Sequence, residues 1–510
     1  MSTPQAFSRD TPTAKVAVGT AATFLKHAKV VGLLTLVSRV TGLVREIVSA
    51  HYLGTGLVAS AFTVAFTIPN LFRKLFGEGA LSAAFIPLYI KAVRAEREAE
   101  ERRLSGDGMA VDGNGTAPDV AHARRDPAAP PGDDVPPFAG PGSANLFAAA
   151  GVNLLVSILL GITVVGELGL FAAMAFWPGL RADHLLTLRL TAIMLPYVLL
   201  ICGTAFLSGV LQVHKRFAAP AAAPVLLNLC HIAVLVLGAT ALGLGAASGG
   251  DRDAVTARQT TLVYWLAVAV LAAGGLQVAV LTPGLRAVGF RFRLAVGLWT
   301  PMTRQMLKLT VPVALGAGVV QLSVLLDRGI STLFMQGVGP AGELITHATV
   351  FGQSVRYPME AGAPARLAVA QFMYLFPLGI FATALATAIF PSLSADALER
   401  DRTAFKASLR QGLEAALWEG IPASAGLILV CRPAVKLLFR HGQITDHDAE
   451  LISRSLAVYA AAIWAFSLLQ IASRAFYAVH DMRTPLVMSV VNLAINLAVE
   501  LPLIWWMGEA

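Results

Sequence analysis

The chain has 510 residues, of which 56% are apolar and only 14% are charged, and its mean hydropathy is +0.67. Because soluble domains carry about 25% charged residues, this composition excludes an ordinary soluble enzyme, a disordered chain, a collagen and a disulfide-stapled secreted module. The 39 Lys and Arg residues exceed the 31 Asp and Glu residues, and the net charge of +8 indicates the cytoplasmic loops of a polytopic membrane protein rather than nucleic-acid binding.

Apolar stretches predict eleven membrane-spanning helices, because a helix needs about 20 mostly apolar residues to cross the hydrocarbon. The predicted spans are residues 30–53, 56–90, 145–177, 184–212, 219–246, 260–282, 305–335, 367–393, 408–430, 452–475 and 484–507. Several of them have a proline at mid-depth: Pro69, Pro196, Pro224, Pro312, Pro377 and Pro422. Broken helices of this kind are typical of transporters rather than of inert anchors.

Basic residues follow every even-numbered span, as with Arg94 after the second span and Lys215 after the fourth. The positive-inside rule therefore predicts that these loops, and the N-terminal segment of residues 1–29, are cytoplasmic. That segment has no apolar core followed by a cleavage site, so no removable signal peptide is expected. One connection opposes this topology, because Arg432, Lys436 and Arg440 lie on the predicted outer side.

The chain is predicted to form two lobes, residues 30–282 and 305–510, joined by a cytoplasmic linker at 283–304. Residues 104–143 are rich in Gly, Pro, Asp and Ala and are expected to be a disordered cytoplasmic insert in the first lobe. Residues 337–366 form a second irregular segment on the outer side. Its charged residues Arg356, Glu360 and Arg366 favour a solvated loop, with a cover over a cavity as the alternative.

An internal repeat links the two predicted lobes. Residues 79–87 read GALSAAFIP and residues 383–391 read TALATAIFP, and each copy ends an even-numbered span. Copies of equal orientation indicate a parallel repeat, two bundles related by an axis along the membrane normal, with a site between them. Chance similarity between two helices rich in small residues is the alternative.

The first two spans carry polar side chains where they are costly: Ser38, Arg39, Arg45, Glu46, Asn70, Arg73, Lys74 and Glu78. A charge at the bilayer centre costs about 2.5–3.5 kcal/mol, so such groups usually face a cavity or a partner. Arg39 and Arg45 are six residues apart, which places them about 240° apart around a helix, suited to a broad cavity but not to a narrow seam. Arginine favours an anionic ligand, because its planar fork binds phosphate and carboxylate. Interhelical ion pairs with snorkelling are the alternative.

Other chemistry-bearing residues give weaker indications. Asp327 and Arg328 in the seventh span are interpreted as an internal ion pair or part of an ion site. Residues 441–450 hold several His, Asp and Glu, which are expected to cap the tenth span rather than bind a metal. The three cysteines, Cys202, Cys230 and Cys431, are expected to be small buried hydrophobes. The sequence has no P-loop, HExxH or GxSxG motif, so no enzyme activity and no bound cofactor are predicted.

From about Val30 onward, the chain resembles the MurJ/MviN lipid II flippases of the multidrug/oligosaccharidyl-lipid/polysaccharide (MOP) exporter superfamily. The most specific stretches are Ser38-Arg39-Val40-Thr41-Gly42-Leu43-Val44-Arg45-Glu46, then Pro69-Asn70-Leu71-Phe72-Arg73-Lys74-Leu75-Phe76-Gly77-Glu78-Gly79-Ala80, and Phe376-Pro377-Leu378-Gly379. Further similar residues are Pro196-Tyr197, Pro220-Ala221, Asn228, Asp481 and Thr484-Pro485. Together these motifs are highly specific, although any one alone would be weak.

The resemblance implies an all-α, two-lobed MOP/MATE-like helix bundle in the bacterial cytoplasmic (inner) membrane. It also implies movement of lipid II, an undecaprenyl-pyrophosphoryl disaccharide-pentapeptide, to the outer leaflet for peptidoglycan synthesis and cell shape. The substrate-binding residues carried over from the family are Ser38, Arg39, Arg45, Arg73 and Glu78. Alternating access would be driven by the membrane potential or a monovalent ion, and the expected partners are membrane lipids and cell-wall synthesis proteins.

Three departures from the family pattern leave alternatives open. Ser60 stands where the family often has an acidic residue, and Phe372 stands where it usually has an arginine. Arg366 is a candidate substitute for that arginine if the helix register shifts. The chain also ends after about eleven of fourteen expected spans, which favours a truncated second lobe. The alternatives are a flippase for another polyprenyl-linked saccharide such as O-antigen, a drug or cation antiporter, and a non-transporting scaffold of the cell-wall machinery.

Overall fold

The structure is a computed structural model, and it describes residues 12–77, 80–104, 142–177, 179–244, 252–293, 299–340, 342–350, 352–380, 382–399, 402–479, 481 and 483–508. In the first half these residues form helices α1 (Pro12–Leu53), α2 (Leu57–Phe72), the π-helix η1 (Arg73–Gly77), α3 (Ala80–Leu104), α4 (Ser143–Phe176), α5 (Ala182–Met194), α6 (Tyr197–Val213), α7 (Ala218–Ala241) and α8 (Arg252–Ala287). The second half contains α9 (Pro301–Leu333), α10 (Ala363–Ile380), α11 (Ala382–Leu398), α12 (Arg402–Phe439), α13 (Asp446–Ala461), α14 (Ile463–Ala478) and α15 (Arg483–Met507). The all-α architecture predicted from composition is confirmed.

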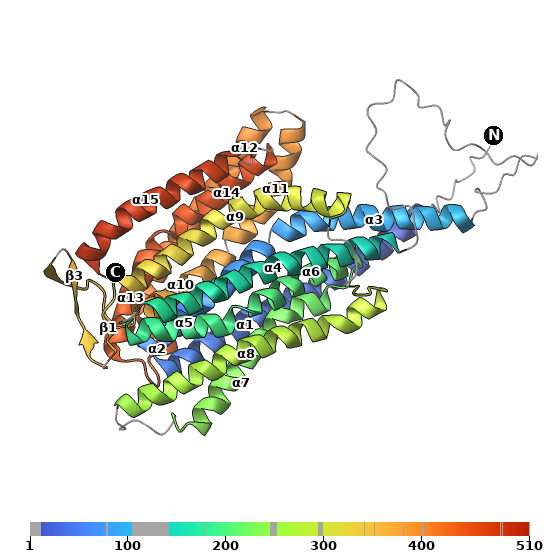
Figure 1. The fold of residues 1–510 in the computed structure, drawn as a ribbon. Coiled ribbons are helices and arrows are strands. Elements are labelled where there is room, and N and C mark those ends of the chain that lie inside the picture. Colours follow the sequence, from blue (N-terminus) through green and yellow to red (C-terminus); the bar gives the residue numbers. More distant parts are fainter. Residues whose placement is uncertain are drawn as a thin grey trace, which may run out of the picture.

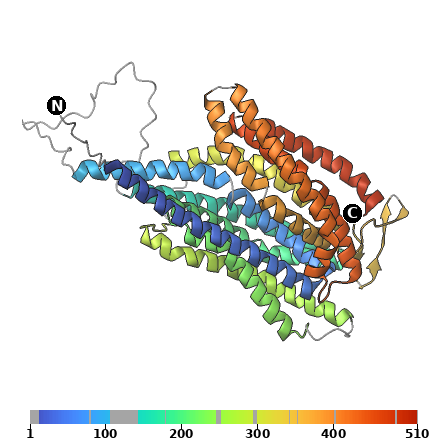
Figure 2. The same cartoon turned by 180° about the vertical axis from the view of Figure 1, so that it is seen from behind.

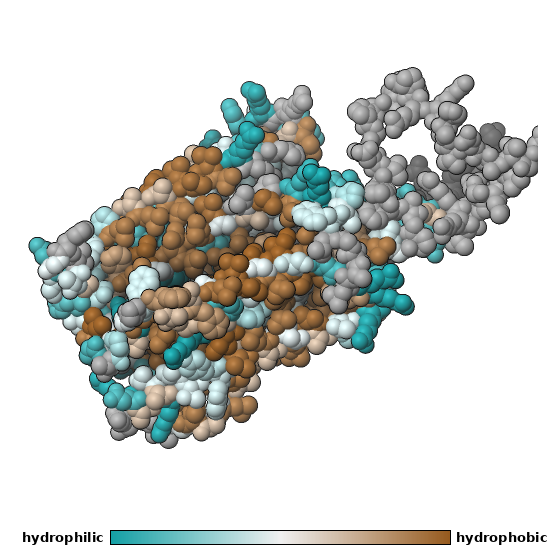
Figure 3. Space-filling model, viewed as in Figure 1, coloured by the Kyte–Doolittle hydropathy of each residue, from teal (hydrophilic) through white to brown (hydrophobic). Residues whose placement is uncertain are grey.

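The helices run side by side along one long direction (Figure 1). Six of the described helices are long and apolar enough to cross a membrane, and the number rises to eight if each of two bent pairs is one span. The bent pairs are α5 with α6 and α13 with α14, each with an angle of 41°. Apolar side chains cover the middle of the face in Figure 3, and hydrophilic side chains gather at its two ends. The chain is therefore a multi-pass membrane protein, while the count of eleven spans stays a prediction.

Prolines break three of the predicted spans. Pro196 lies between α5 and α6, and Pro69 lies near the end of α2, directly before the π-helix. Pro377 lies three residues before the end of α10, where α11 takes over. The two copies of the repeat thus occupy equivalent places, because each follows a proline-containing helix and forms the beginning of the next one. In contrast, Pro224 lies inside the continuous helix α7.

Buried apolar side chains form separate clusters in the two halves of the chain. The largest cluster is built almost wholly from α2 to α8, with Phe85, Phe147 and Phe206 among its fully buried side chains. A second cluster joins α10, α12 and α13. Figure 2 shows α1 on the near face of the bundle, where it packs mainly on α7 of the first half and also contacts α12 of the second. The predicted lobe limits and the linker at 283–304 stay predictions, and most of the insert at 104–143 lies outside the described residues.

The segment between α9 and α10 folds into two antiparallel β-hairpins at one end of the bundle, which we call the hairpin end (Figure 2). The first hairpin pairs β1 (Gly337–Val338) with β2 (Leu344–Ile345), and the second pairs β3 (His347–Val350) with β4 (Gln353–Arg356). Arg181 anchors the first hairpin, because its guanidinium donates to the Met335 carbonyl at 3.1 Å and to the Asp183 carboxylate. Arg356 and Glu360 are exposed as expected of a loop, but the prediction that Arg366 is solvated is wrong, since it is 3% exposed.

Candidate functional site: a cationic cavity

The predicted cations of the first two spans meet around one cavity of about 680 Å³. Its wall comes from α1, α2, η1, α6, α7 and α8 of the first half and from α10 of the second. Ser38, Arg39, Arg45 and Arg73 all line it, and Lys74 adds a fourth cation. The cavity is broad enough to hold Arg39 and Arg45 on different sides of α1, as their spacing required. Glu78 lies outside the described residues.

Asn228 of α7 fixes the cation-bearing part of α1. Its Nδ2 donates to the Ser38 carbonyl at 3.1 Å and to Thr41 Oγ1 at 3.2 Å. Its Oδ1 accepts from Arg45 Nη1 at 3.2 Å, and Arg45 also pairs with the Glu46 carboxylate. One amide therefore sets both the position of α1 and the direction of the Arg45 guanidinium.

The π-helix η1 carries the third arginine. Arg73 is its first residue, and Arg73 Nε donates to Asn70 Oδ1 at 3.0 Å. A π-helical turn is uncommon and is found mostly at functional sites. The turn begins four residues after Pro69, whose missing N–H leaves the Ala65 carbonyl without its usual helical donor. The wider turn brings Arg73 and Lys74 to the same cavity as Asn70.

Arg39 reaches across to the second half of the chain. A side chain at Gly379 of α10 would lie 2.6 Å from Arg39 Nη1, so only glycine allows the guanidinium to lie this close to the helix. Among the described residues, Arg39 has no ion pair and no hydrogen bond to another side chain or to the backbone. Its charge is therefore available to a ligand in the cavity.

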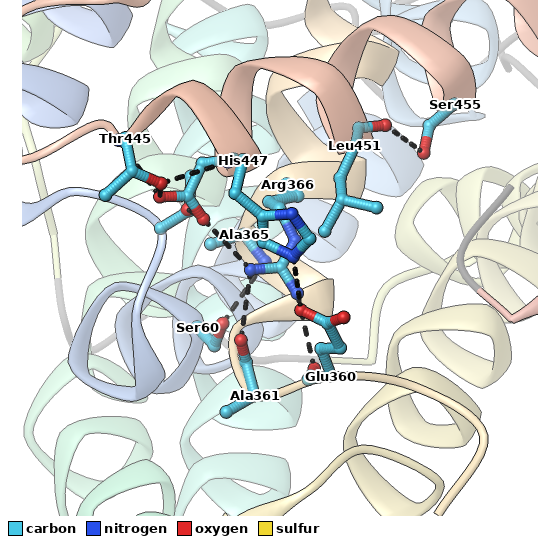
Figure 4. A network of polar contacts seen from close by, with 11 residues as sticks. Ser60, Glu360, Ala361, Ala365, Arg366, Thr445, His447, Leu451 and Ser455 are labelled. Atoms are coloured by element: carbon cyan, nitrogen blue, oxygen red, sulfur yellow. Dashed lines mark hydrogen bonds and ion pairs between the residues drawn. The ribbon is translucent and has the colours of Figure 1, made fainter.

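The hairpin end of the cavity is sealed by contacts between the two halves (Figure 4). Ser60 Oγ accepts a hydrogen bond from the Ala365 backbone N–H at 3.2 Å, so the residue that stands where the resemblance implied an acidic group binds the first turn of α10. Arg366 Nη1 binds Asp448 Oδ1 at 3.2 Å, and that carboxylate oxygen also accepts from Thr55 Oγ1 at 2.8 Å. Gly362 packs so closely on the Thr55 carbonyl that an added Cβ would lie 1.9 Å from its oxygen.

These contacts correct one expectation and confirm another. Arg366 does not replace the arginine missing at position 372, because it does not line the cavity and is held instead by Asp448 and by the Ala361 carbonyl. Phe372 itself lines the cavity. The expected capping of the tenth span is confirmed, since Thr445 and Asp448 form a capping box at the start of α13.

The interpretation of Asp327 and Arg328 as an ion pair is also wrong among the described residues. Arg328 donates to the Pro364 carbonyl at 2.8 Å and to Gln371 Oε1 at 2.7 Å. Asp327 faces α15 instead, where it accepts from Asn496 Nδ2 at 3.0 Å. The carboxyl group of Glu500, also on α15, lies close to that of Asp327.

Sequence reasoning missed a second, smaller cavity of about 230 Å³ that adjoins the first. Arg45, Asn70 and Phe372 line both cavities, while Arg328 and His231 line only the second. Arg328 was visible as a charge in an apolar span, but nothing in the sequence showed which face of α9 it occupies. A single histidine in an apolar stretch gave no signal at all.

Comparisons with known proteins identify the family. The model of the family described as "Lipid II flippase MurJ" matches residues 49–107 and 140–510. A probable lipid II flippase MurJ of Rhizobium meliloti is 30% identical over 485 residues, covering 94% of this chain and 75% of the relative. The lipid II flippase MurJ of Burkholderia cenocepacia is 29% identical, covering 88% of this chain and 72% of the relative.

Solved structures agree on the fold. A lipid II flippase MurJ in an inward closed conformation aligns with a TM-score of 0.64 and 19% identity, covering 94% of this chain and 82% of that one. An inward-facing multidrug resistance MATE family transporter of the MOP superfamily aligns with a TM-score of 0.55 and 13% identity, covering 92% and 88%. The two-lobed MOP-type fold expected from the sequence is thereby confirmed, and the chain belongs to the lipid II flippase MurJ family.

Proposed function

We propose that this protein flips lipid II from the inner to the outer leaflet of the bacterial cytoplasmic membrane by alternating access, and that it does no chemistry on the substrate. The observation that carries this proposal is the cavity of about 680 Å³ lined by Arg39, Arg45, Arg73 and Lys74. Among the described residues, its lining includes no Asp or Glu.

The charge of this cavity favours an anionic lipid head group. Each cation held within the membrane costs about 2.5–3.5 kcal/mol on insertion scales, and an anionic ligand in the cavity would offset this cost, above all at Arg39. A pyrophosphate carries several negative charges on closely spaced oxygens, and guanidinium groups bind such oxygens in bidentate fashion. Ser38 and Asn70 add neutral hydrogen-bonding groups at the same wall. An antiporter of cationic drugs would need the opposite charge, which disfavours that alternative.

The sealed hairpin end supports a conformation that is closed on one side. The cavity wall extends from Arg45 along α1 to Val31, and along α6 to Gln212, away from the hairpin end. If the basic loops are cytoplasmic, the hairpin end faces outward and the cavity loads its substrate from the cytoplasmic side. Release then requires the contacts of Ser60 and Arg366 to break.

Energy for the cycle would come from the membrane potential or from a monovalent ion. One elementary charge crossing 100 mV contributes about 2.3 kcal/mol. The carboxyl groups of Asp327 and Glu500, with the amide of Asn496, offer a place where a proton or a monovalent cation could bind between α9 and α15. Asp327→Asn would then abolish the ion dependence of transport while lipid II binding persists.

Complementation of a strain depleted of its lipid II flippase tests the proposal. The wild-type gene should restore growth, and Arg39→Gln should abolish rescue at equal protein level. Arg432→Gln is the matched control, because Arg432 lies outside both cavities in an exposed pair with Glu450. A wild-type protein that restores O-antigen display but not growth would select the other polyprenyl-linked substrate, and rescue by the Arg39 variant would remove the cationic cavity from the mechanism.

A further inference from the structure

The second cavity contains a buried cation, Arg328, that forms no ion pair with any described residue, although Glu46 lines the same cavity. Arg328 is 8% exposed, and its two described hydrogen bonds go to neutral oxygens, those of Pro364 and Gln371. The carboxylates of Asp327 and Glu46 act on it only from beyond ion-pairing distance. Asp327 is held by Asn496, and Glu46 by Arg45. A buried charge without a partner is strongly destabilising, so the site favours an anion.

The opposite wall of the same cavity presents an unsatisfied polar group. His231 of α7 is 3% exposed, and at least one of its ring nitrogens has no hydrogen-bond partner among the described residues. Its ring packs edge-to-face on Phe62 and Phe66, with centroids 6.1 and 5.6 Å away, so the rings fix its orientation. Buried polar atoms are nearly always hydrogen-bonded, and the cavity is the place from which a ligand could satisfy this one.

We propose that the second cavity binds a carboxylate-bearing part of the lipid-linked head group, with Arg328 as its cation and His231 as a neutral hydrogen-bonding partner. This inference rests on the proposed function and adds a subsite to it. The pyrophosphate would occupy the larger cavity, where Arg39 and Arg73 lie. Arg45 is shared by both cavities and would lie between the two ligand groups.

Two features favour a carboxylate over a second phosphate group. The cavity has only about a third of the volume of its neighbour, 230 against 680 Å³. In addition, Glu46 already offsets Arg45, and of the remaining cations of this cavity, Arg328 and Lys74, only Lys74 also lines the larger cavity. A planar guanidinium matches a carboxylate through two parallel hydrogen bonds. Because Arg328 comes from α9, the second half of the chain supplies a guanidinium to the cavity although position 372 is a phenylalanine.

Binding to purified full-length protein in lipid nanodiscs tests the subsite with two probes. Lipid II carries the carboxylates of its peptide, whereas undecaprenyl pyrophosphate carries the pyrophosphate alone. We expect Arg328→Gln to weaken lipid II binding at least about tenfold, since it removes a charged hydrogen bond, and to change undecaprenyl pyrophosphate binding less than about twofold. Arg328→Lys should recover part of the lipid II affinity. Arg39→Gln should weaken both ligands.

The matched control is Arg474→Gln. Arg474 also lies in the second half and donates to a neutral oxygen, that of Thr387, but it lines neither cavity; its variant should bind both probes as the wild type does. Equal losses for both probes in Arg328→Gln, or no loss, overturn the inference. A wild-type protein that binds undecaprenyl pyrophosphate but not lipid II overturns the proposed function instead.

A second variant keeps the test decisive if Arg328→Gln fails to fold. Gln371→Glu leaves Arg328 in place. It converts the side-chain amide, whose oxygen Arg328 binds at 2.7 Å, into a carboxylate. This internal carboxylate should compete with the ligand and reproduce the selective loss of lipid II affinity. Wild-type affinity for lipid II in Gln371→Glu would contradict the subsite.

Discussion

Arg366→Gln should open the hairpin end of the protein. The Arg366 side chain is only 4% exposed, and it joins α10 to the Asp448 carboxylate, which also accepts from Thr55 of the α1–α2 turn. Glutamine cannot carry the charge, and it is too short to reach Asp448 and the Ala361 carbonyl together. The variant therefore removes the ionic part of the contact between the two halves and leaves the Ser60–Ala365 hydrogen bond in place.

The size of the effect follows from burial. Removing one partner of a fully buried ion pair costs about 3–5 kcal/mol. The cost here is smaller, about 2 kcal/mol, because Asp448 is 17% exposed and keeps its bonds to Thr55 and Thr445. If the substitution destabilises only the conformation with a closed hairpin end, the ratio of closed to open molecules falls roughly 30-fold.

Thiol labelling measures this ratio. Ala365 is 4% exposed and packs on the core of the first half, so a cysteine introduced by Ala365→Cys, in a background without the three native cysteines, should react slowly with a maleimide in nanodiscs. Arg366→Gln should raise the labelling rate roughly 30-fold, whereas Arg432→Gln, an exposed ion pair at the same end, should leave it unchanged. An unchanged rate in Arg366→Gln, with the same unfolding temperature, would refute the view that this pair holds the end closed.

Three further variants test the positions that shape the site. Asn228→Leu should lower the free energy of unfolding by about 1–3 kcal/mol, because Arg45, Ser38 and Thr41 lose their shared partner; an unchanged thermal unfolding temperature would contradict its role as a clamp. Gly362→Ala should speed labelling of the cysteine introduced by Ala365→Cys, because Gly362 has φ +94° and lies against the Thr55 carbonyl. Gly56→Ala is the control and should not change the labelling rate, because a Cβ at Gly56 would have no atom within 4 Å. Asp481→Asn should lower stability at neutral pH, because hydrogen bonds from Thr484 hold the pKa of Asp481 below its ordinary value. The difference should shrink as the pH falls below the ordinary pKa of an aspartate and vanish once the wild-type carboxylate is protonated; a difference that persists in acid would exclude the charge as its cause.

The sequence predicted the helical bundle and the convergence of its arginines, because these depend on local patterns. Apolar length marks spans, and the cost of a buried guanidinium requires that Arg39, Arg45 and Arg73 find a polar environment. The two proline-broken helices were equally visible, since Pro69 and Pro377 precede the two copies of one repeat. The role of these residues in binding lipid II stays a prediction.

Long-range pairing could not be predicted. Nothing in the local pattern distinguishes Arg366, which pairs with a residue 82 positions away, from a solvated loop residue. Likewise, Asp327 and Arg328 are neighbours in sequence, but successive helical residues point about 100° apart, and packing decides which helix each one meets. The β-hairpins were also missed, because strands of two to four residues resemble an irregular loop.

The first β-hairpin belongs to the second half by chain order but is fastened to the first half. Arg181 holds it through the Met335 carbonyl and lies 5.4 Å from the centre of the Tyr357 ring, while Asp183 accepts from the Val338 backbone. Only a few residues, ending at Gly362, connect this anchored region to α10. If the halves part at this end, the contour length of that short stretch limits how far α10 can move away from the first half. Inserting one or more glycines there would increase the permitted movement of α10 in steps, without changing any residue that lines the cavities.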